Sequence, residues 1–255
     1  MYAINSTSYR SRYGYNNRVR FLVFHYTAAN FSSSVNTLTG ASVSAHYLIP
    51  DFNDPSYLKA GFNEPQIFNL VDENQRAWHA GVSSWGGRNN LNDTSIGVEI
   101  VNLATDNQGQ FTFPPYDPRQ IEAIQYLASN LLQRYPDISP VNVVGHSDIA
   151  AGRKSDPGPM FPWQALYAKG IGAWFDESTQ RACMHAYECA GLPTREQLLG
   201  LFKKYGYDTS AATTSMGFQR LVRAFQLHFR PARYDGVMDI ETAANLAALV
   251  KKYCP

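Results

Sequence analysis

RVRFLVFHY, residues 18–26, is a continuous β-branched and aromatic run that ends in a histidine and a tyrosine. A run of this kind, without polar alternation, predicts a strand that is buried on both faces of a sheet. Two further stretches have the same character, SIGVEIVN at residues 95–102 and VNVVGH at residues 141–146. We therefore expect these three strands to belong to one buried sheet.

The segment between the second and third strands has the spacing of an amphipathic helix. Asp117 is a good N-cap, and Pro118 suits the first helical position that follows it. Strands that alternate with helices predict an α/β fold, here a central mixed β-sheet flanked by helices over residues 1–175. The helix is expected over residues 118–135, with apolar residues at Ile121, Ile124, Leu127, Leu131 and Leu132.

The C-terminal part of the chain has a different pattern, with short amphipathic helices in place of strands. These helices are expected at residues 193–205, 217–229 and 239–253, and Thr194 with Gln197 resembles a capping box. The pattern predicts a compact three-helix module over residues 191–255, joined to the sheet part by a linker at residues 176–190.

The overall composition excludes several classes of protein. The net charge is +1, so the chain has no general attraction to nucleic acid or to an anionic membrane. No stretch approaches the roughly 18 apolar residues that a membrane-spanning helix needs, and the N-terminus lacks the apolar core of a secretory signal. Three cysteines do not make a disulfide framework, although a local pair between Cys183 and Cys189 stays open.

Two histidines follow the apolar parts of predicted strands, and an aspartate lies close behind one of them. His25 ends the first strand, His146 ends the third, and Asp156 lies in a loop stiffened by Pro157 and Pro159. Ligand sites form at the carboxyl ends of strands in open α/β sheets. Two histidines and a carboxylate would hold zinc with its fourth position open to water, although manganese or iron also fits these residue types.

The spacing alone leaves alternatives for this site. Asp148, two residues after His146, is as good a candidate ligand as Asp156. Each histidine taken singly could instead be a hydrogen-bonded core residue.

Glu99 lies in the middle of an apolar strand, with Val98 and Ile100 on the opposite face. A carboxylate in that place is costly unless it is paired or functional. Beside a metal-bound water it would serve as a general base. A buried ion pair with an arginine or lysine is the alternative, and for Lys154 the alternative to a role in the site is a solvated surface position.

Six motifs, in this order along the chain, resemble the type 2 zinc-dependent N-acetylmuramoyl-L-alanine amidases. This family includes bacterial wall-recycling and lipoprotein amidases, phage endolysins and, more distantly, animal peptidoglycan recognition proteins. The C-terminal AFQLHFRPARYDGVMDIET, residues 224–242, is similar to the three-helix peptidoglycan-binding modules of wall hydrolases. The six motifs are FHYTA at residues 24–28, SAHYLI at 44–49, WHAG at 78–81, LNDTSIGVEI at 91–100, GHSDIA at 145–150 and RKSDPG at 153–158.

The resemblance implies a fold, a metal and a role for each motif. It implies an amidase-like α/β domain with Zn²⁺ on His25, His146 and Asp156, which leaves Asp148 out. It gives Glu99 the role of base and Lys154 that of stabilising the oxyanion. Structural packing is the alternative for Tyr47 and for its neighbour His46, and a buried turn is the alternative for the WHAG motif. The residues that the resemblance places along the substrate groove are Trp78, His79, Ala80, Gly81, Asn92, Thr94 and Ser95, joined by Tyr47 near the metal.

The implied reaction is hydrolysis of the amide between the lactyl group of N-acetylmuramic acid and L-alanine of the stem peptide. The alternatives are a recognition protein that binds peptidoglycan without cutting it, and a zinc peptidase that cuts within the stem. We expect action in the periplasm, reached by secretion without a signal into target cells, with a cognate immunity protein as partner. The other two expectations for its location are a trimmed lipoprotein and a cytoplasmic recycling enzyme. The sequence also allows a homo-oligomer. It indicates no role for His185 or His228.

Overall fold

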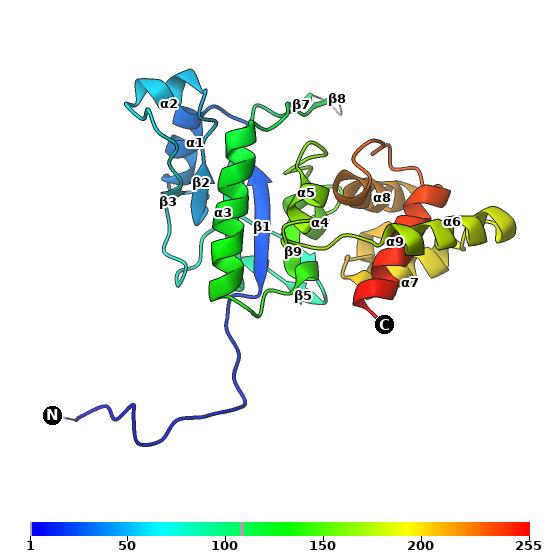
Figure 1. The fold of residues 1–255 in the computed structure, drawn as a ribbon, viewed down its shortest axis with the longest axis horizontal. Helices are drawn as coiled ribbons and strands as arrows, with labels where there is room; N and C mark the ends of the chain where they lie inside the picture. Colours follow the sequence, from blue (N-terminus) through cyan, green and yellow to red (C-terminus); the bar gives the residue numbers. More distant parts are fainter. Residues whose placement is uncertain (1, 108–109) are drawn as a thin grey trace.

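A five-stranded sheet forms the centre of the computed structural model, which describes residues 2–107 and 110–255 (Figure 1). Four of its strands run parallel, and β3 at one edge is antiparallel to its neighbour. The expected mixed sheet is therefore confirmed. In spatial order the strands are β3 (Phe68–Asn69), β2 (Tyr47–Ile49), β6 (Ser95–Ile100), β1 (Phe21–Tyr26) and β9 (Val143–Gly145).

The three predicted strands are β1, β6 and β9, each shorter than the stretch that predicted it. β1 is buried over five of its six residues, as a run without polar alternation requires. It lies between β6 and β9, and its register pairs His25 with Glu99 and Phe24 with Gly145. The polar residues at the carboxyl ends of these strands are thereby brought to the same edge of the sheet.

Helix α3 (Pro118–Arg134) runs along one face of this sheet (Figure 1). Asp117 and Gln120 form a complete capping box at its start, which confirms the predicted N-cap. The amide of Gln120 also donates to the Val101 carbonyl just after β6, at 2.8 Å, so the cap fastens the helix to the sheet. Ile124 and Leu131 of the apolar stripe are fully buried.

The remaining elements of the sheet part are short. They are α1 (Phe31–Leu38), α2 (Pro55–Lys59), β4 (Ser84–Trp85), β5 (Arg88–Asn89), η1 (Leu91–Asp93), β7 (Thr105–Asn107), β8 (Gln110–Thr112), η2 (Pro140–Asn142), α4 (His146–Ile149) and α5 (Trp163–Tyr167).

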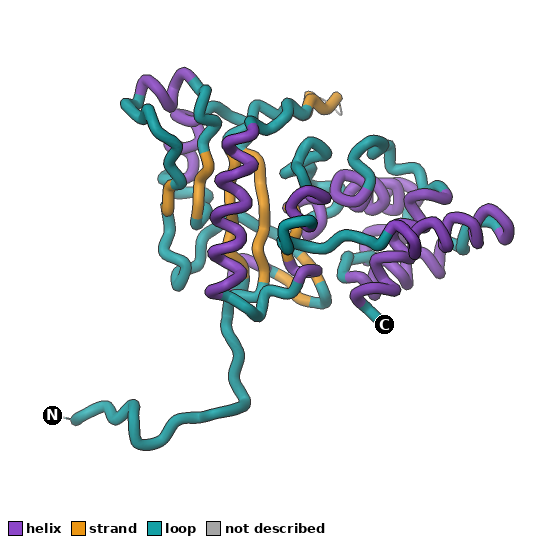
Figure 2. Tube along the Cα trace, viewed as in Figure 1, coloured by secondary structure: helices purple, strands orange, loops and turns teal. Residues whose placement is uncertain are grey.

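The C-terminal part is helical and lies beside the β9 edge of the sheet (Figure 2). The three predicted helices are confirmed as α7 (Arg195–Tyr205), α8 (Ser215–Phe229) and α9 (Ile240–Tyr253), with a 3₁₀ turn η3 (Ser210–Thr213) before α8. The Thr194–Gln197 capping box is also formed. The aromatic rings of Tyr205 and Tyr207 lie against Trp85 of β4, with ring centroids 5.9 and 4.7 Å apart.

The predicted linker is wrong in its conformation, because residues 177–190 form a further helix, α6 (Glu177–Ala190). Its buried residue is Cys183, which packs against Ala244 and Ala247 of α9. Because these side chains are small, the segment has no helical repeat of large apolar residues by which the sequence could predict a helix. The structure thus adds a fourth helix to the C-terminal part, and helices α7, α8 and α9 share one apolar core with the sheet.

The structure also bears on the cysteine pairing that the sequence left open and on membrane-spanning helices. The cysteines Cys183, Cys189 and Cys254 are all free, so the open pairing does not form. Among the helices of the described ranges, none has the length and apolar character needed to cross a bilayer.

Candidate metal centre and active site

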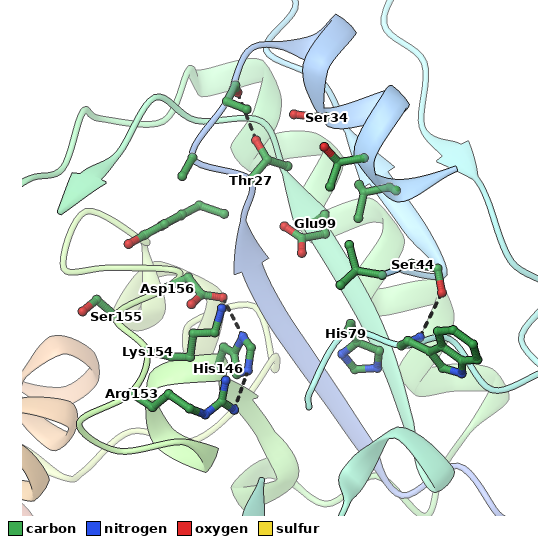
Figure 3. Close-up of a pocket in the computed structure, with 17 residues that line it drawn as sticks. Thr27, Ser34, Ser44, His79, Glu99, His146, Arg153, Lys154, Ser155 and Asp156 are labelled. Atoms are coloured by element: carbon green, nitrogen blue, oxygen red, sulfur yellow. Dashed lines mark hydrogen bonds and ion pairs between the residues drawn. The ribbon is translucent and has the colours of Figure 1, made fainter. Parts of the chain in front are cut away.

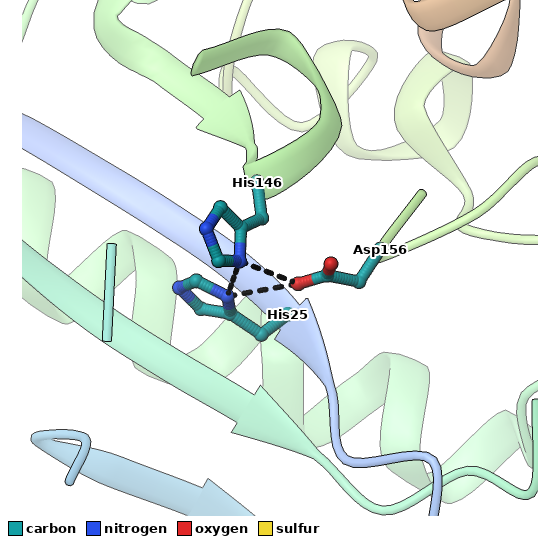
Figure 4. A group of neighbouring side chains, drawn as sticks. All are labelled: His25, His146 and Asp156. Carbon is teal, nitrogen blue, oxygen red and sulfur yellow. Dashed lines mark hydrogen bonds and ion pairs between the residues drawn. The ribbon is translucent and has the colours of Figure 1, made fainter. Parts of the chain in front are cut away.

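Three side chains from separate segments converge at the carboxyl end of the sheet (Figure 4). His25 comes from β1, His146 opens α4 directly after β9, and Asp156 comes from the loop that follows. All three are buried, and their candidate ligand atoms lie within 4.8 Å of one another. We call His25, His146 and Asp156 the inward cluster.

The closest atoms of the inward cluster are two ring nitrogens and one carboxylate oxygen. Asp156 Oδ2 lies 2.9 Å from His25 Nδ1 and 3.1 Å from His146 Nδ1. The two Nδ1 atoms are 3.0 Å apart. What these atoms can do depends on where the ring protons lie, and the neighbours of each ring assign those protons.

The far side of the His25 ring contacts a chain of hydrogen bonds. Ser95 Oγ donates to the Leu91 carbonyl at 2.6 Å, so it accepts from His79 Nε2 at 3.1 Å. The neutral His79 ring then accepts at Nδ1 from His25 Nε2, at 3.0 Å. This leaves a lone pair on His25 Nδ1, the atom that faces the inward cluster.

The His146 ring is oriented in the same way. Its Nε2 lies 3.0 Å from the Ala80 carbonyl oxygen, which can only accept, so that nitrogen carries the proton. In the neutral ring Nδ1 again has a lone pair. Two nitrogen lone pairs and a carboxylate oxygen therefore face one point, and a cation there would satisfy all three.

The titration behaviour of the inward cluster suits a cation. Burial lowers the pKa of His25 to about 4, against the opposing effect of its bond to Asp156. Burial also lowers the pKa of His79 well below its usual value, and the neighbouring histidines add to this. Burial alone would raise the pKa of Asp156; positive charge opposite its carboxylate, carried by protonated His146 and His25 rings when no cation is bound, holds that pKa below its usual range. Neutral histidines beside an ionised carboxylate are the protonation states that bind metal.

Glu99 stands beside the inward cluster because β6 pairs with β1 in the register that sets it opposite His25. Its carboxylate points across a cavity of about 360 Å³ toward Lys154 and Asp156 (Figure 3). Burial raises the pKa of Glu99 well above its usual value; Asp156 raises it further, and Lys154 opposes them. Glu99 Oε2 is buried and has no hydrogen-bond partner among the described residues, so the alternative of a buried ion pair is not what the structure has.

Lys154 lines the same cavity, from the loop that also carries Asp156. Lys154 is exposed, and within residues 2–107 and 110–255 no carboxylate forms an ion pair with it. Its neighbour Arg153, for which the sequence indicated no role, donates to the carbonyl oxygens of Ala80 and Val82, at 3.1 and 2.5 Å. Arg153 thus ties the loop to the WHAG stretch, and its position next to Lys154 in the RKSDPG motif was the available signal.

The expected substrate-contacting residues divide into two groups. Trp78, with 51% of its surface exposed, and His79 line the cavity. The other six are not among the described residues that line this cavity. Tyr26, Thr27, Ser34 and Ser44 line it as well and were missed, because hydroxyl side chains carry no distinctive spacing.

Most of the residues outside the cavity hold the groups around it. Asn92 accepts from the backbone N–H groups of His79 and Ala80, at 3.1 and 2.7 Å. The buried Ser95 supports His79, the Thr94 carbonyl accepts from the start of β1, and Gly81 packs against Arg153. Tyr47 donates to Glu73 instead of facing the cavity. His46 bonds to the Gly97 N–H and the Gln75 carbonyl, which is the packing alternative.

Asp148, the rival ligand, is not part of the inward cluster. Its carboxylate accepts from Gly145, Tyr207 and His228, on the side of α4 that faces the C-terminal helices. Asp156, and not Asp148, therefore lies beside the two histidines.

Comparisons with known proteins agree with this geometry. Residues 15–159 match the N-acetylmuramoyl-L-alanine amidase family. Over 239 residues, 92% of this chain and 84% of the relative, the chain is 46% identical to N-acetylmuramoyl-L-alanine amidase AmiD of Escherichia coli K12. The chain belongs to this amidase family, and the expectation of a hydrolase of this class is confirmed.

Two solved structures extend the likeness over the whole chain. AmpDh3 from Pseudomonas aeruginosa, in complex with anhydromuramic pentapeptide, has a TM-score of 0.98 and 58% identity over 99% of both chains. AmiD from E. coli, in complex with the substrate anhydro-N-acetylmuramic acid-L-Ala-D-γ-Glu-L-Lys, has a TM-score of 0.86 and 42% identity, covering 98% of this chain and 95% of that one. The α/β fold with its helical C-terminal part is thus shared with these two proteins.

Proposed function

We propose that this protein is a zinc-dependent amidase that cuts between the lactyl group of N-acetylmuramic acid and L-alanine of the peptidoglycan stem peptide. The observation that carries the proposal is the inward cluster, in which two nitrogen lone pairs and a carboxylate oxygen face one point beside the cavity. Mixed nitrogen and oxygen ligands suit zinc, and three protein ligands leave a position for water or substrate. Glu99, whose Oε2 is buried without a hydrogen-bond partner among the described residues, lies beside the inward cluster, within the cavity where a water would need a base.

Zinc held by His25, His146 and Asp156 would supply Lewis-acid polarisation and make a bound water acidic. Glu99 accepts the proton of the attacking water and delivers it to the departing amine of L-alanine. This role suits a carboxylate whose pKa burial raises well above its usual value. Lys154 places an ammonium group at the cavity, where it compensates the negative charge that develops on the carbonyl oxygen.

For the substrate, we propose muropeptides, including those with 1,6-anhydro ends. The support comes from the two relatives whose structures hold anhydromuramyl peptides. Trp78 offers an exposed aromatic face at the cavity, which suits packing against a sugar or peptide. We further propose that the sheet part, residues 1–175, performs the reaction and that the helical part, residues 191–255, binds the wall.

We place the action on the wall in the periplasm, as an effector delivered to target cells, with an immunity protein that blocks the cavity. This rests on the wall-derived substrate class and on the resemblance of residues 224–242 to wall-binding modules. Expression with and without an added export signal tests it. Lysis only on export is expected, whereas no effect in either case would contradict it and favour a cytoplasmic recycling role.

The bond cut is tested by mass spectrometry of soluble anhydromuramyl tripeptide and of purified sacculi after incubation with the protein. Free peptides that begin at L-alanine are expected from at least one of the two. Fragments cut within the stem would instead identify a peptidase. Intact muropeptides, together with protein that sediments with the wall, would reduce the function to binding.

A further inference from the structure

One buried carboxylate near the inward cluster has no part in the proposed reaction. Asp148 is 1% exposed and lies two residues after His146 on the short helix α4. Its Oδ2 accepts from the Gly145 N–H at 2.8 Å, which closes the first turn of the helix that begins with His146. Residues 145–148 thus form one hydrogen-bonded turn, so a shift of Asp148 also shifts His146.

The other two donors to Asp148 come from the C-terminal helices. The Tyr207 hydroxyl, just after α7, donates to Oδ1 at 2.6 Å. His228 Nδ1, in the last turn of α8, lies 2.7 Å from Oδ2 and must donate, because that oxygen already accepts from Gly145. His228 Nε2 is buried without a partner among the described residues, so the ring makes its hydrogen bond through Nδ1.

The His228 ring is held in place from both sides. It stacks on Trp163 with centroids 3.7 Å apart and on Phe229 with centroids 3.8 Å apart. Trp163 belongs to α5 in the sheet part, so the ring is packed across the junction of the two parts. A ring packed in this way presents its N–H to Asp148 in one orientation.

Helix α8 also contacts the loop that carries the third member of the inward cluster. Arg223 donates to Ser155 Oγ at 3.2 Å, one residue before Asp156. The Ser147 N–H in turn donates to the Asp156 carbonyl at 2.8 Å. Two of the three members, His146 and Asp156, therefore lie on segments that α8 braces.

We propose that Tyr207 and His228 are positioning residues of the metal centre, acting through Asp148 on helix α4 and hence on His146. The C-terminal helices then complete the active site, in addition to any binding of the wall. The inference rests on the proposed function, because it takes a metal as the occupant of the inward cluster. A carboxylate that loses a donor in a buried place relaxes toward other partners, and α4 is too short to resist this.

The test compares zinc affinity, measured by competition with a chromogenic chelator, in full-length variants. Tyr207→Phe and His228→Leu each remove one donor to Asp148. Tyr253→Phe is the matched control, because it removes a hydroxyl whose hydrogen-bond partner, within the part of the chain that the structure describes, is the backbone of Trp174. His228→Asn keeps an N–H close to the position of Nδ1 and serves as the conservative variant.

We expect Tyr207→Phe and His228→Leu to raise the zinc dissociation constant by about 10- to 100-fold, as loss of outer-shell partners does. Tyr253→Phe should keep the wild-type constant, and His228→Asn should recover most of the loss. Wild-type affinity in Tyr207→Phe, with a fall in unfolding midpoint like that of Tyr253→Phe, would overturn the inference alone. Absence of zinc binding in the folded wild-type chain would refute the proposed function as well. If His228→Leu does not fold, Tyr207→Phe decides.

Discussion

Two polar clusters of this protein differ in how their donors and acceptors are matched. In the Glu73 cluster, the Glu73 carboxylate accepts from Arg134 at the end of α3 and from the hydroxyls of Tyr135 and Tyr47. Every partner of that carboxylate is a donor. In the inward cluster, by contrast, a carboxylate oxygen and two ring nitrogens, all with lone pairs, face one another at about 3 Å.

The difference separates a structural cluster from a functional one. A matched cluster is complete in the protein alone and contributes to stability. A cluster of facing acceptors is incomplete without a cation, and folding alone would not select it. The inward cluster also adjoins the cavity that Glu99 and Lys154 line, whereas the Glu73 cluster joins α3 to β2. Substitutions in each cluster, and in the cavity beside the inward cluster, test this difference.

Outside the inward cluster, Glu99→Gln should produce the largest effect. The amide keeps the shape of the side chain but cannot accept a proton, so we expect kcat to fall by about 10²- to 10⁴-fold. Zinc binding should stay unchanged, because Glu99 is outside the inward cluster. Release of peptide from an anhydromuramyl tripeptide under saturating substrate measures this. A variant with nearly wild-type kcat would remove Glu99 from the mechanism.

Gly97→Ala should disturb the inward cluster indirectly. A Cβ at Gly97 would lie 2.4 Å from Cγ of His79, so the His79 ring that braces His25 must move. We expect zinc affinity to fall by about 10- to 100-fold.

Gly200→Ala in α7 is the matched control, because a Cβ there meets no heavy atom within 4 Å. It should keep wild-type zinc affinity and stabilise the helix slightly. Equal zinc affinity in the two variants, measured by chelator competition, would show that the His79 contact does not hold His25.

Glu73→Gln should affect stability and leave the chemistry intact. Burial opposes ionisation of Glu73, but the bonds from Arg134, Tyr135 and Tyr47 prevail and lower its pKa from 4.5 to about 2. Because the folded-state pKa lies below the unfolded one, this stabilisation is present above pH 4.5 and lost as the pH falls toward 2. Allowing for solvent around the part-exposed Arg134, its size is about 2 kcal/mol.

Denaturant unfolding of wild type and Glu73→Gln, at neutral pH and near pH 2.5, measures the free energy of unfolding that the ionised Glu73 carboxylate contributes. The difference between the two proteins should shrink as the pH falls, while kcat at neutral pH stays the same. A difference that persists at the lower pH would mean that the ionised carboxylate is not what stabilises this cluster.

Trp78→Ala should have the smallest effect. The side chain is half exposed at the cavity and is separate from both clusters. Loss of its aromatic face is expected to raise KM by about 3- to 10-fold, with kcat nearly unchanged, because such packing binds ground state and transition state alike. Steady-state kinetics on anhydromuramyl tripeptide decide, and a fall in kcat without a change in KM would contradict this role.

Much of the fold and of the inward cluster could be predicted from the sequence, because both depend on local signals. The apolar run 18–26 marks a buried strand, and Asp117 with Pro118 marks a helix start. His25 and His146 belong to segments whose carboxyl ends must meet if the strands share a parallel sheet. Each of these features is legible within a few residues of chain.

The features that could not be predicted depend on contacts between distant segments. Helix α6 was taken for a linker because its packing against α9 uses alanine and cysteine, which leave no stripe of large apolar residues. His228 received no role because its partner Asp148 is 80 residues away. Ser95 and Asn92 were expected to touch substrate, but in the folded chain they hold His79 and the backbone beside it.

The most direct test of the central claim is a zinc titration of metal-free protein, following bound metal and peptide release in the same samples. We predict that activity rises in parallel with zinc up to one ion per chain, and that Asp156→Asn abolishes both. Full amidase activity in protein shown to contain no metal would contradict the account, since the facing acceptors of the inward cluster would then need another explanation.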